Sequence, residues 1–233
     1  MTVNLVKVDT IKKEYSGRMI LNGISFSIIK NEILAIIGPN GTGKTTTVEI
    51  ILGMRGPDSG SIYLNKIDRK RDMGAQLQNT PFFYNLTVEE NIRLICNFYQ
   101  LKNRTDIIND VIKLFDLESV KKANVYSLSG GQKKRLSIAL ATLHNPKIIF
   151  LDEPTANLDP RGRMKVRKII QHLATRGHSV VFTSHDMNEV VKIAHRVLIF
   201  VNGKIIDSGN PQELIEKYRV RSLEDVYLLL TEK

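Results

Sequence analysis

Residues 38–46 have the types and spacing of a loop that binds phosphate. They read GPNGTGKTT and lie between an apolar run at 34–37 and a helical pattern. Glycines let the backbone turn tightly so that its N–H groups face phosphate oxygens, and the positive end of the following helix attracts the same anion. Lys44 places a charge near the β- and γ-phosphates, and Thr45 offers a hydroxyl to a magnesium ion. The segment therefore predicts a bound nucleoside triphosphate with Mg²⁺, contacted by Gly38, Asn40, Gly41, Thr42, Gly43, Lys44, Thr45 and Thr46.

Two adjacent carboxylates, Asp152 and Glu153, follow the continuous apolar run 148–151. Neighbouring residues in an extended chain point to opposite sides, so the two groups are able to do different work. Asp152 fits a place behind Thr45, where it holds magnesium through water, and Glu153 fits a place facing the γ-phosphate, where it orients a hydrolytic water. A pair of solvated acids at a strand end is the alternative.

A second anion-binding pattern occurs at 128–132, which reads LSGGQ at the start of a helix expected to run through Leu143. The glycines bare backbone N–H groups, and the helix dipole favours an anion there. Because one triphosphate already fills the first loop, a second γ-phosphate receptor makes most sense if it serves a nucleotide held by another copy. A simple helix cap would explain Ser129 and Gln132 but not Gly130 and Gly131.

The periodicity of the chain predicts an α/β fold. Continuous apolar runs such as 148–151 indicate a mostly parallel sheet flanked by helices, whereas alternation at 24–28 and 61–64 indicates an antiparallel β subdomain near the N-terminus. Strand patterns vanish from about 79 to 127, and helices are expected at 88–99 and 106–115. The strand-like segments are 5–8, 24–28, 33–37, 61–64, 73–77, 148–151, 180–183 and 197–201. We expect one domain over 1–233, with a nucleotide-binding core in 1–78 and 128–233 and a helical subdomain in 79–127.

Composition sets the compartment and the class of partner. The chain has 233 residues, a formal net charge of +10 and one cysteine. It contains no apolar stretch near the roughly 20 residues that span a bilayer and no signal-peptide core, so a cytosolic location is expected. Its basic clusters, 66–71 and 133–135, lack the interleaved aromatic residues of a base-stacking surface. A basic face near an anionic membrane is therefore favoured over nucleic acid.

Taken in order, these motifs resemble those of the nucleotide-binding subunit of an ATP-binding cassette (ABC) transporter, over nearly the whole chain. The family's motifs match GPNGTGKTT at 38–46, a glutamine loop at Gln78, LSGGQ at 128–132, IIFLDEP at 148–154, a loop at 156–159 and a switch histidine at His185. The resemblance implies a P-loop NTPase core. It also implies a dimer contact for Asp159.

Further roles follow from the same resemblance. Tyr15 is expected to stack on adenine, with a plain packing tyrosine as the alternative. Both Gln76 and Gln78 precede the helical insertion, and Gln78 is chosen for the magnesium and the attacking water because residues 79–81 after it have the pattern of a flexible link. His185 follows residues 180–184 and so lies at a strand end, where an imidazole would touch the γ-phosphate. The aromatic residues at 82–84 are either a docking place for a membrane subunit or part of the core.

The resemblance implies an ATPase, using ATP and Mg²⁺, that powers export through separate membrane-spanning permease subunits. Two ABC subunits, expected to be identical, would sandwich two ATP molecules between the loop 38–46 of one chain and LSGGQ of the other. The protein would be cytoplasmic and peripheral on the inner face of the cell membrane, without a nucleic-acid partner. Residues 222–227 resemble the tail of cassettes that serve small exporters. The alternatives are a soluble ABC-type ATPase acting on ribosomes or nucleic acid, and a phosphate-loop kinase.

Overall fold

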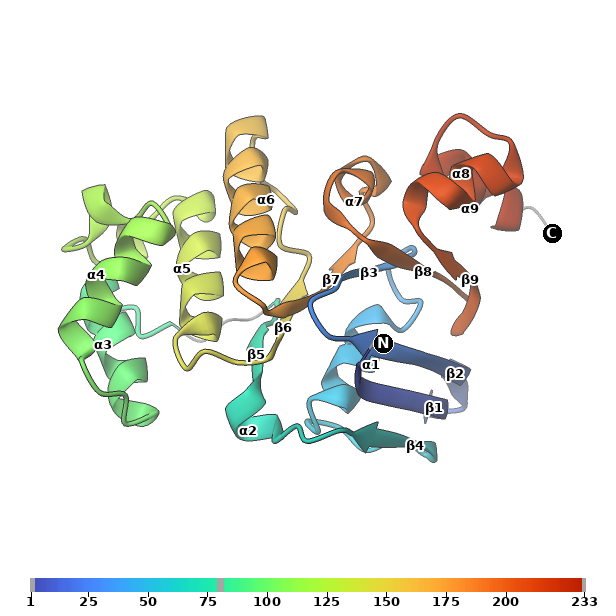
Figure 1. Ribbon diagram of the computed structural model, residues 1–233, viewed down its shortest axis with the longest axis horizontal. Helices are drawn as coiled ribbons and strands as arrows, with labels where there is room; N and C mark the ends of the chain where they lie inside the picture. The colour runs from blue at the N-terminus through green and yellow to red at the C-terminus, as the bar shows by residue number, and fades with distance from the viewer. Residues whose placement is uncertain (1–2, 79–81, 232–233) are drawn as a thin grey trace.

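Apolar runs form the centre of a six-stranded sheet in the computed structural model, which describes residues 3–78 and 82–231 (Figure 1). The strand order is β5-β6-β7-β3-β8-β9, and every pair is parallel except β8 with β9. All residues of β3, β6 and β7 are buried, as expected for strands covered on both faces. The strands are β3 (Ile33–Ile37), β5 (Met73–Gln76), β6 (Ile148–Asp152), β7 (Ser179–Ser184), β8 (Arg196–Val201) and β9 (Lys204–Gly209).

Two apolar cores lie on opposite faces of this sheet. Along β3, Ile33, Ala35 and Ile37 belong to one core, and Leu34 and Ile36 belong to the other. The first core packs under the helices α5 (Gly130–Thr142), α6 (Pro160–Thr175) and α7 (Met187–Ile193). The second packs against α1 and a separate antiparallel sheet with the order β2-β1-β4, built from β1 (Asn4–Tyr15), β2 (Arg18–Ile29) and β4 (Ser59–Leu64). The predicted α/β architecture, with its N-terminal antiparallel sheet, is therefore confirmed.

One strand was absent from the sequence prediction. β9 alternates between exposed and half-buried residues and adds an antiparallel edge to β8. The turn between them is Asn202-Gly203, and both residues have positive φ, at 47° and 73°. Asn-Gly is the preferred sequence for such a two-residue hairpin, so the signal lay in the turn and not in the apolar pattern.

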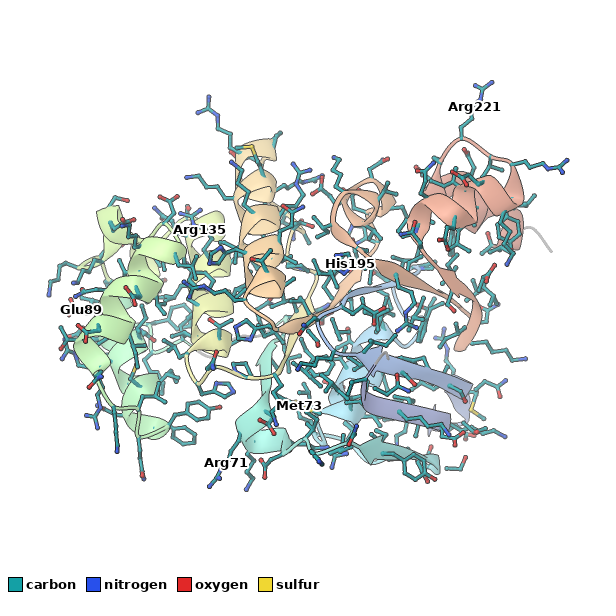
Figure 2. All side chains as sticks on the ribbon, viewed as in Figure 1. Arg71, Met73, Glu89, Arg135, His195 and Arg221 are labelled. Atoms are coloured by element: carbon teal, nitrogen blue, oxygen red, sulfur yellow. The ribbon has the colours of Figure 1, made fainter. Side chains whose placement is uncertain are left out.

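Helices fill the segment between β5 and α5, and the described part of this segment contains no strand of either sheet. Figure 1 shows α3 (Val88–Phe98) and α4 (Arg104–Leu114) together at the end of the molecule opposite to the C-terminal helices α8 (Pro211–Tyr218) and α9 (Leu223–Thr231). Arg135 of α5, labelled in Figure 2, ties this segment to the core, because its guanidinium donates to the carbonyls of Phe115 (2.9 Å) and Asp116 (3.0 Å) at the end of α4. The expected link at 79–81 lies outside the described residues.

The helices begin where capping residues predict. Capping boxes are present at Thr87 and Ser129, and the side chains of Asp159, Asp186 and Asn210 each accept a backbone N–H at a helix start. The helices are α1 (Lys44–Ile51), α2 (Arg69–Asp72), α3 (Val88–Phe98), α4 (Arg104–Leu114), α5 (Gly130–Thr142), α6 (Pro160–Thr175), α7 (Met187–Ile193), α8 (Pro211–Tyr218) and α9 (Leu223–Thr231).

Candidate nucleotide-binding site

The phosphate-type loop joins β3 to α1, and its shape depends on Gly43. This residue has φ 97°, and a Cβ there would overlap the Leu21 side chain and lie 2.9 Å from the carbonyl oxygen of Ile20. Gly43 is also the N-cap of α1, so no side chain caps the first N–H groups of the helix. These groups remain available to an anion at the positive end of the helix dipole.

Lys44 points back into the loop that precedes it. Its Nζ donates to the carbonyls of Gly38 (2.7 Å) and Pro39 (2.9 Å), and the residue is 5% exposed. Burial lowers the pKa of the Lys44 ammonium below its usual value, and the negative charges of Glu153 and Asp152 offset only part of this shift. The two carboxylates therefore lie near enough to influence the loop lysine, as a shared phosphate site requires.

Asp152, the last residue of β6, lies directly behind Thr45. Its Oδ2 accepts from Thr45 Oγ1 at 3.0 Å, its Oδ1 accepts from Thr183 Oγ1, and the residue is 1% exposed. The hydroxyl, the carboxylate and the nearby Gln78 amide are hard oxygen donors of the kind that Mg²⁺ prefers. The residues present therefore fit a magnesium site, and the metal role of each stays a prediction.

Glu153 differs from the expected geometry. It does not continue the strand but adopts φ 47°, a left-handed conformation that costs a non-glycine residue roughly 1–2 kcal/mol. The sequence analysis expected both carboxylates on one extended segment, with their side chains on opposite sides. This expectation was wrong, because the strand ends at Asp152. The Glu153 N–H donates to Thr183 Oγ1 at 3.0 Å, and Glu153 Oε1 lies 3.0 Å from Nδ1 of His185.

Lys44, Thr45 and Glu153 line a cleft of about 450 Å³, a volume within the usual range of small-molecule sites. Of the two glutamines considered, Gln78 lines the cleft, whereas Gln76 is 1% exposed and donates to the carbonyls of Leu77 and Asp152. Tyr15, at the mouth, is 38% exposed. The residues lining the cleft are Tyr15, Ile20, Asn40, Gly41, Gly43, Lys44, Thr45, Thr46, Gln78 and Glu153.

The comparisons with known proteins agree with this geometry. The sequence model of the family described as "ABC transporter" matches residues 21–156, more than half of the chain. This chain belongs to the ABC transporter family. It is an ATP-binding subunit and an ATPase.

Relatives with export and import names both match. The chain is 34% identical over 225 residues to the Nod factor export ATP-binding protein I of Burkholderia pseudomallei (strain 1710b), covering 93% of this chain and 74% of that protein. It is 34% identical over 228 residues to the spermidine/putrescine import ATP-binding protein PotA of Spiroplasma citri, covering 92% and 64%. A solved structure titled as the ATP binding subunit of an ABC transporter superposes with a TM-score of 0.86 at 24% identity, covering 97% of this chain and 99% of that one, which supports the fold.

Several predicted residues of this ABC subunit lie outside the cleft of their own chain. Ser129 and Gln132 form the capping box of α5, through Ser129 Oγ with the Gln132 N–H (3.3 Å) and Gln132 Oε1 with the Ser129 N–H (2.8 Å). A Cβ on Gly130 would meet nothing within 4 Å, and one on Gly131 would come no closer than 3.8 Å to another atom. Packing within the chain therefore explains neither glycine, and LSGGQ presents an open backbone at a helix start.

The remaining predicted residues have local partners. Asp159 is exposed and caps α6 through the Gly162 N–H at 2.8 Å, and its dimer contact stays a prediction. Thr42 Oγ1 donates to the Pro39 carbonyl at 3.0 Å within the loop. Gly38 and His185 are not among the residues that line the cleft but line a second hollow, together with Glu224, Tyr227 and Leu228 of α9.

Three residues that contribute to the site were missed in the sequence. Ile20 lines the cleft from β2, Thr183 bonds both carboxylate residues, and Lys134 donates to the Glu153 carbonyl at 3.0 Å. Thr183 had a signal, since it interrupts an apolar strand two residues before His185. Ile20 and Lys134 had none, because only the folded chain brings them to the site.

Within residues 3–78 and 82–231, no helix is both long and apolar enough to cross a bilayer.

Proposed function

We propose that this chain hydrolyses ATP for an ABC exporter whose membrane-spanning permease is a separate subunit. The carrying observation is the cleft, because it gathers the phosphate loop, Gln78 and Glu153 around one volume, with Asp152 behind Thr45. Export is favoured by the names of relatives such as the Nod factor export protein and by the tail at 222–227. The protein would then lie on the cytoplasmic side of the membrane, and residues 79–127 would act as a helical subdomain.

Each residue of the cleft has a chemical task in this proposal. Lys44 and the N–H groups at the start of α1 bind the β- and γ-phosphates, and Thr45, Asp152 and Gln78 hold Mg²⁺. Bound Mg²⁺ supplies charge neutralisation at the phosphate oxygens. Glu153 orients the attacking water and accepts its proton at a carboxylate oxygen, and this carboxylate lies against the imidazole of His185.

Adenine recognition falls to Tyr15. Its ring is flanked by cations, with Lys13 Nζ at 5.3 Å and Arg55 Cζ at 5.7 Å from the centroid. These contacts hold the ring at the mouth of the cleft, and Ile20 adds an apolar wall beside it. An aromatic ring and an aliphatic side chain together form a surface on which a base stacks.

The LSGGQ residues serve the nucleotide of a second copy in this proposal. They are absent from the cleft lining of their own chain, yet Gly130 and Gly131 are open to an approaching anion. The start of α5 adds a positive dipole end. Two copies would close over two ATP molecules, and Asp159 would lie in the same contact.

Contact with the permease is assigned to the aromatic residues beside Gln78. Phe82 is half-buried and packs on the core, whereas Phe83 and Tyr84 are 52% and 47% exposed. The two explanations offered by the sequence therefore divide among the three residues. Phe83 and Tyr84 are proposed to meet the membrane subunit next to the residue that reaches the attacking water.

A mixing experiment tests the shared site. Lys44→Ala and Ser129→Arg chains, each inactive alone, should regain ATPase activity when mixed, because one heterodimer site then combines an intact phosphate loop with an intact LSGGQ. The matched control places both changes in one chain, which leaves no intact site in its heterodimer with wild type. An excess of this double variant should suppress wild-type activity. No gain in the first mixture and no loss in the second would contradict a site shared between chains.

A further inference from the structure

Lys134 of α5 contacts the backbone of the proposed catalytic residue without lining the nucleotide cleft. Its Nζ donates to the carbonyl oxygen of Glu153 at 3.0 Å, in a partly buried position. Burial lowers the pKa of the Lys134 ammonium below its usual value, and the negative charges of Asp152 and Glu153 offset only part of this shift. Because a partly buried ammonium is costly unless it is hydrogen-bonded, its bond to the Glu153 carbonyl fixes the position of the Lys134 side chain.

The packing of α5 on β5 places Lys134 at the end of the neighbouring strand β6. A Cβ on Gly74 of β5 would overlap the Ala141 carbonyl, so helix and strand are in close contact there. Lys134 precedes Ala141 by seven residues, which is nearly two helical turns and about 10 Å along the same face. Lys134 thus lies nearer the C-terminal end of β6, where its side chain meets the Glu153 carbonyl.

Glu153 needs such a partner because its backbone is left-handed, with φ 47°. Its N–H is held by Thr183 Oγ1, and its carbonyl accepts from Lys134 Nζ and from the Ala156 N–H at 3.3 Å. Of these three partners only Lys134 is charged, and hydrogen bonds from charged donors are about twice as strong as neutral ones. The preceding carbonyl, that of Asp152, accepts from the buried Gln76 at 3.4 Å.

We infer that Lys134 is a positioning residue for hydrolysis, because it holds the Glu153 backbone in the left-handed conformation that presents the carboxylate to the cleft. This inference rests on the catalytic role proposed for Glu153. Without the ammonium, the backbone of Glu153 relaxes toward the extended conformation, and the carboxylate leaves the position that faces the γ-phosphate. Nucleotide binding is retained, since the hydrogen bond of Lys134 goes to the Glu153 carbonyl and not to the phosphate loop.

The test replaces Lys134 with Met and compares this variant with the same change at Lys147, an exposed lysine at the other end of β6 that also donates to a backbone carbonyl. Lys147 Nζ donates to the Lys66 carbonyl at 3.1 Å and pairs with Asp72 Oδ2 at 3.2 Å, so Lys147→Met removes a lysine-to-carbonyl bond, together with an ion pair, before the first residue of β6. In Lys134→Met, kcat should fall about tenfold or more while KM for ATP changes less than about threefold. Lys134→Arg should recover most of the rate, and Lys147→Met should leave kcat and KM as in wild type.

Hydrogen exchange in the nucleotide-free protein supplies a readout that does not depend on turnover. The amide of Ala156 shares the Glu153 carbonyl with Lys134, so its exchange should quicken about threefold or more in Lys134→Met and stay unchanged in Lys147→Met. If Lys134→Met does not fold, Lys134→Gln, which keeps a neutral donor on a shorter stem, replaces it with the same expected division between kcat and KM.

The Glu153→Gln variant distinguishes a failure of the Lys134 inference from a failure of the catalytic role proposed for Glu153. If it is inactive while Lys134→Met keeps kcat within about twofold of wild type, the inference is overturned and the proposed function stands. If Glu153→Gln turns over like wild type, the proposed catalytic role itself is overturned. In the double variant, Lys134→Met should not lower the residual rate of Glu153→Gln, because a positioning residue acts only through its partner. A further loss equal to that in the single variant would also overturn the inference.

Discussion

Thr183 offers the sharpest test of how the site is built, because one hydroxyl holds both carboxylate residues. Its Oγ1 donates to Asp152 Oδ1 and accepts the Glu153 N–H at 3.0 Å, and Thr183 is 0% exposed. Thr183→Val keeps the shape of the side chain and removes both bonds. Both the ATPase activity and the free energy of unfolding should fall, since Asp152 and Glu153 lose the hydroxyl that fixes their relative position.

The magnitude follows from the two bonds. A hydrogen bond to a charged carboxylate contributes about 1.5–3 kcal/mol and one to an amide about 1 kcal/mol, and the extra methyl group offsets about 0.8 kcal/mol of the loss. The free energy of unfolding of the nucleotide-free protein should therefore drop by roughly 2–3 kcal/mol. For a chain of this length that corresponds to about 4–12 °C in Tm.

Urea and thermal unfolding of three variants measure this effect. Thr183→Ser keeps the hydroxyl and loses a methyl group, so it should cost about 1 kcal/mol and retain most of the ATPase activity. Thr142→Val removes a single bond to the Ala139 carbonyl in the last turn of α5 and should cost under about 1 kcal/mol. The reasoning is refuted if Thr183→Val is as stable as Thr142→Val, or if Thr183→Ser is the more damaging change at that position.

Three further predictions concern the phosphate loop, adenine binding and the ion pair of Asp207 with Lys217. Gly43→Ala should lower Tm and ATP affinity more than Gly41→Ala, because both glycines have positive φ but only a Cβ at Gly43 meets other atoms; equal losses in thermal unfolding and ATP titration would contradict this. Tyr15→Ala should weaken ATP binding about tenfold while Tyr15→Phe leaves it nearly unchanged, as fluorescence titration would measure. For Asp207, burial raises the pKa, but hydrogen bonds led by that of Lys217 outweigh it and lower the pKa overall. The stability that this carboxylate contributes is thus present at neutral pH and lost as pH falls through the lowered pKa, so urea unfolding of Asp207→Asn should show a weaker loss on acidification than wild type.

Sequence patterns were most informative where local chemistry determines structure. The apolar runs of β3 and β6 and the capping residues Thr87 and Ser129 predicted buried strands and helix starts that the structure contains. The same patterns were silent on β9, because an edge strand is half-exposed and lacks a long apolar run. They also gave no hint of the left-handed backbone at Glu153, since two of its three backbone partners, Thr183 and Lys134, lie far from it in the sequence.

The adjacent lysines of α5 show where sequence information ends. Lys133 and Lys134 are the same residue type in the same helix, and both follow the LSGGQ pattern. A step of about 100° around the helix sends them to different places. Lys133 Nζ lies 6.0 Å from the ring centroids of Tyr84 and Tyr126, on the side of the proposed permease contact, whereas Lys134 bonds the Glu153 backbone.

The two lysines have different partners because α5 packs on the sheet in one rotation about its own axis. That rotation depends on contacts at both ends of α5. The capping box at Ser129 sets where the helix begins, and the close approach of Gly74 to Ala141 sets which face lies on β5. Gly74→Ala would push the helix away from the strand, since its Cβ would overlap a backbone carbonyl. Lys134 would then lose its place although its own sequence position is unchanged. The role of such a residue belongs to the packed helix and strand, so a motif that ends at Gln132 cannot contain it.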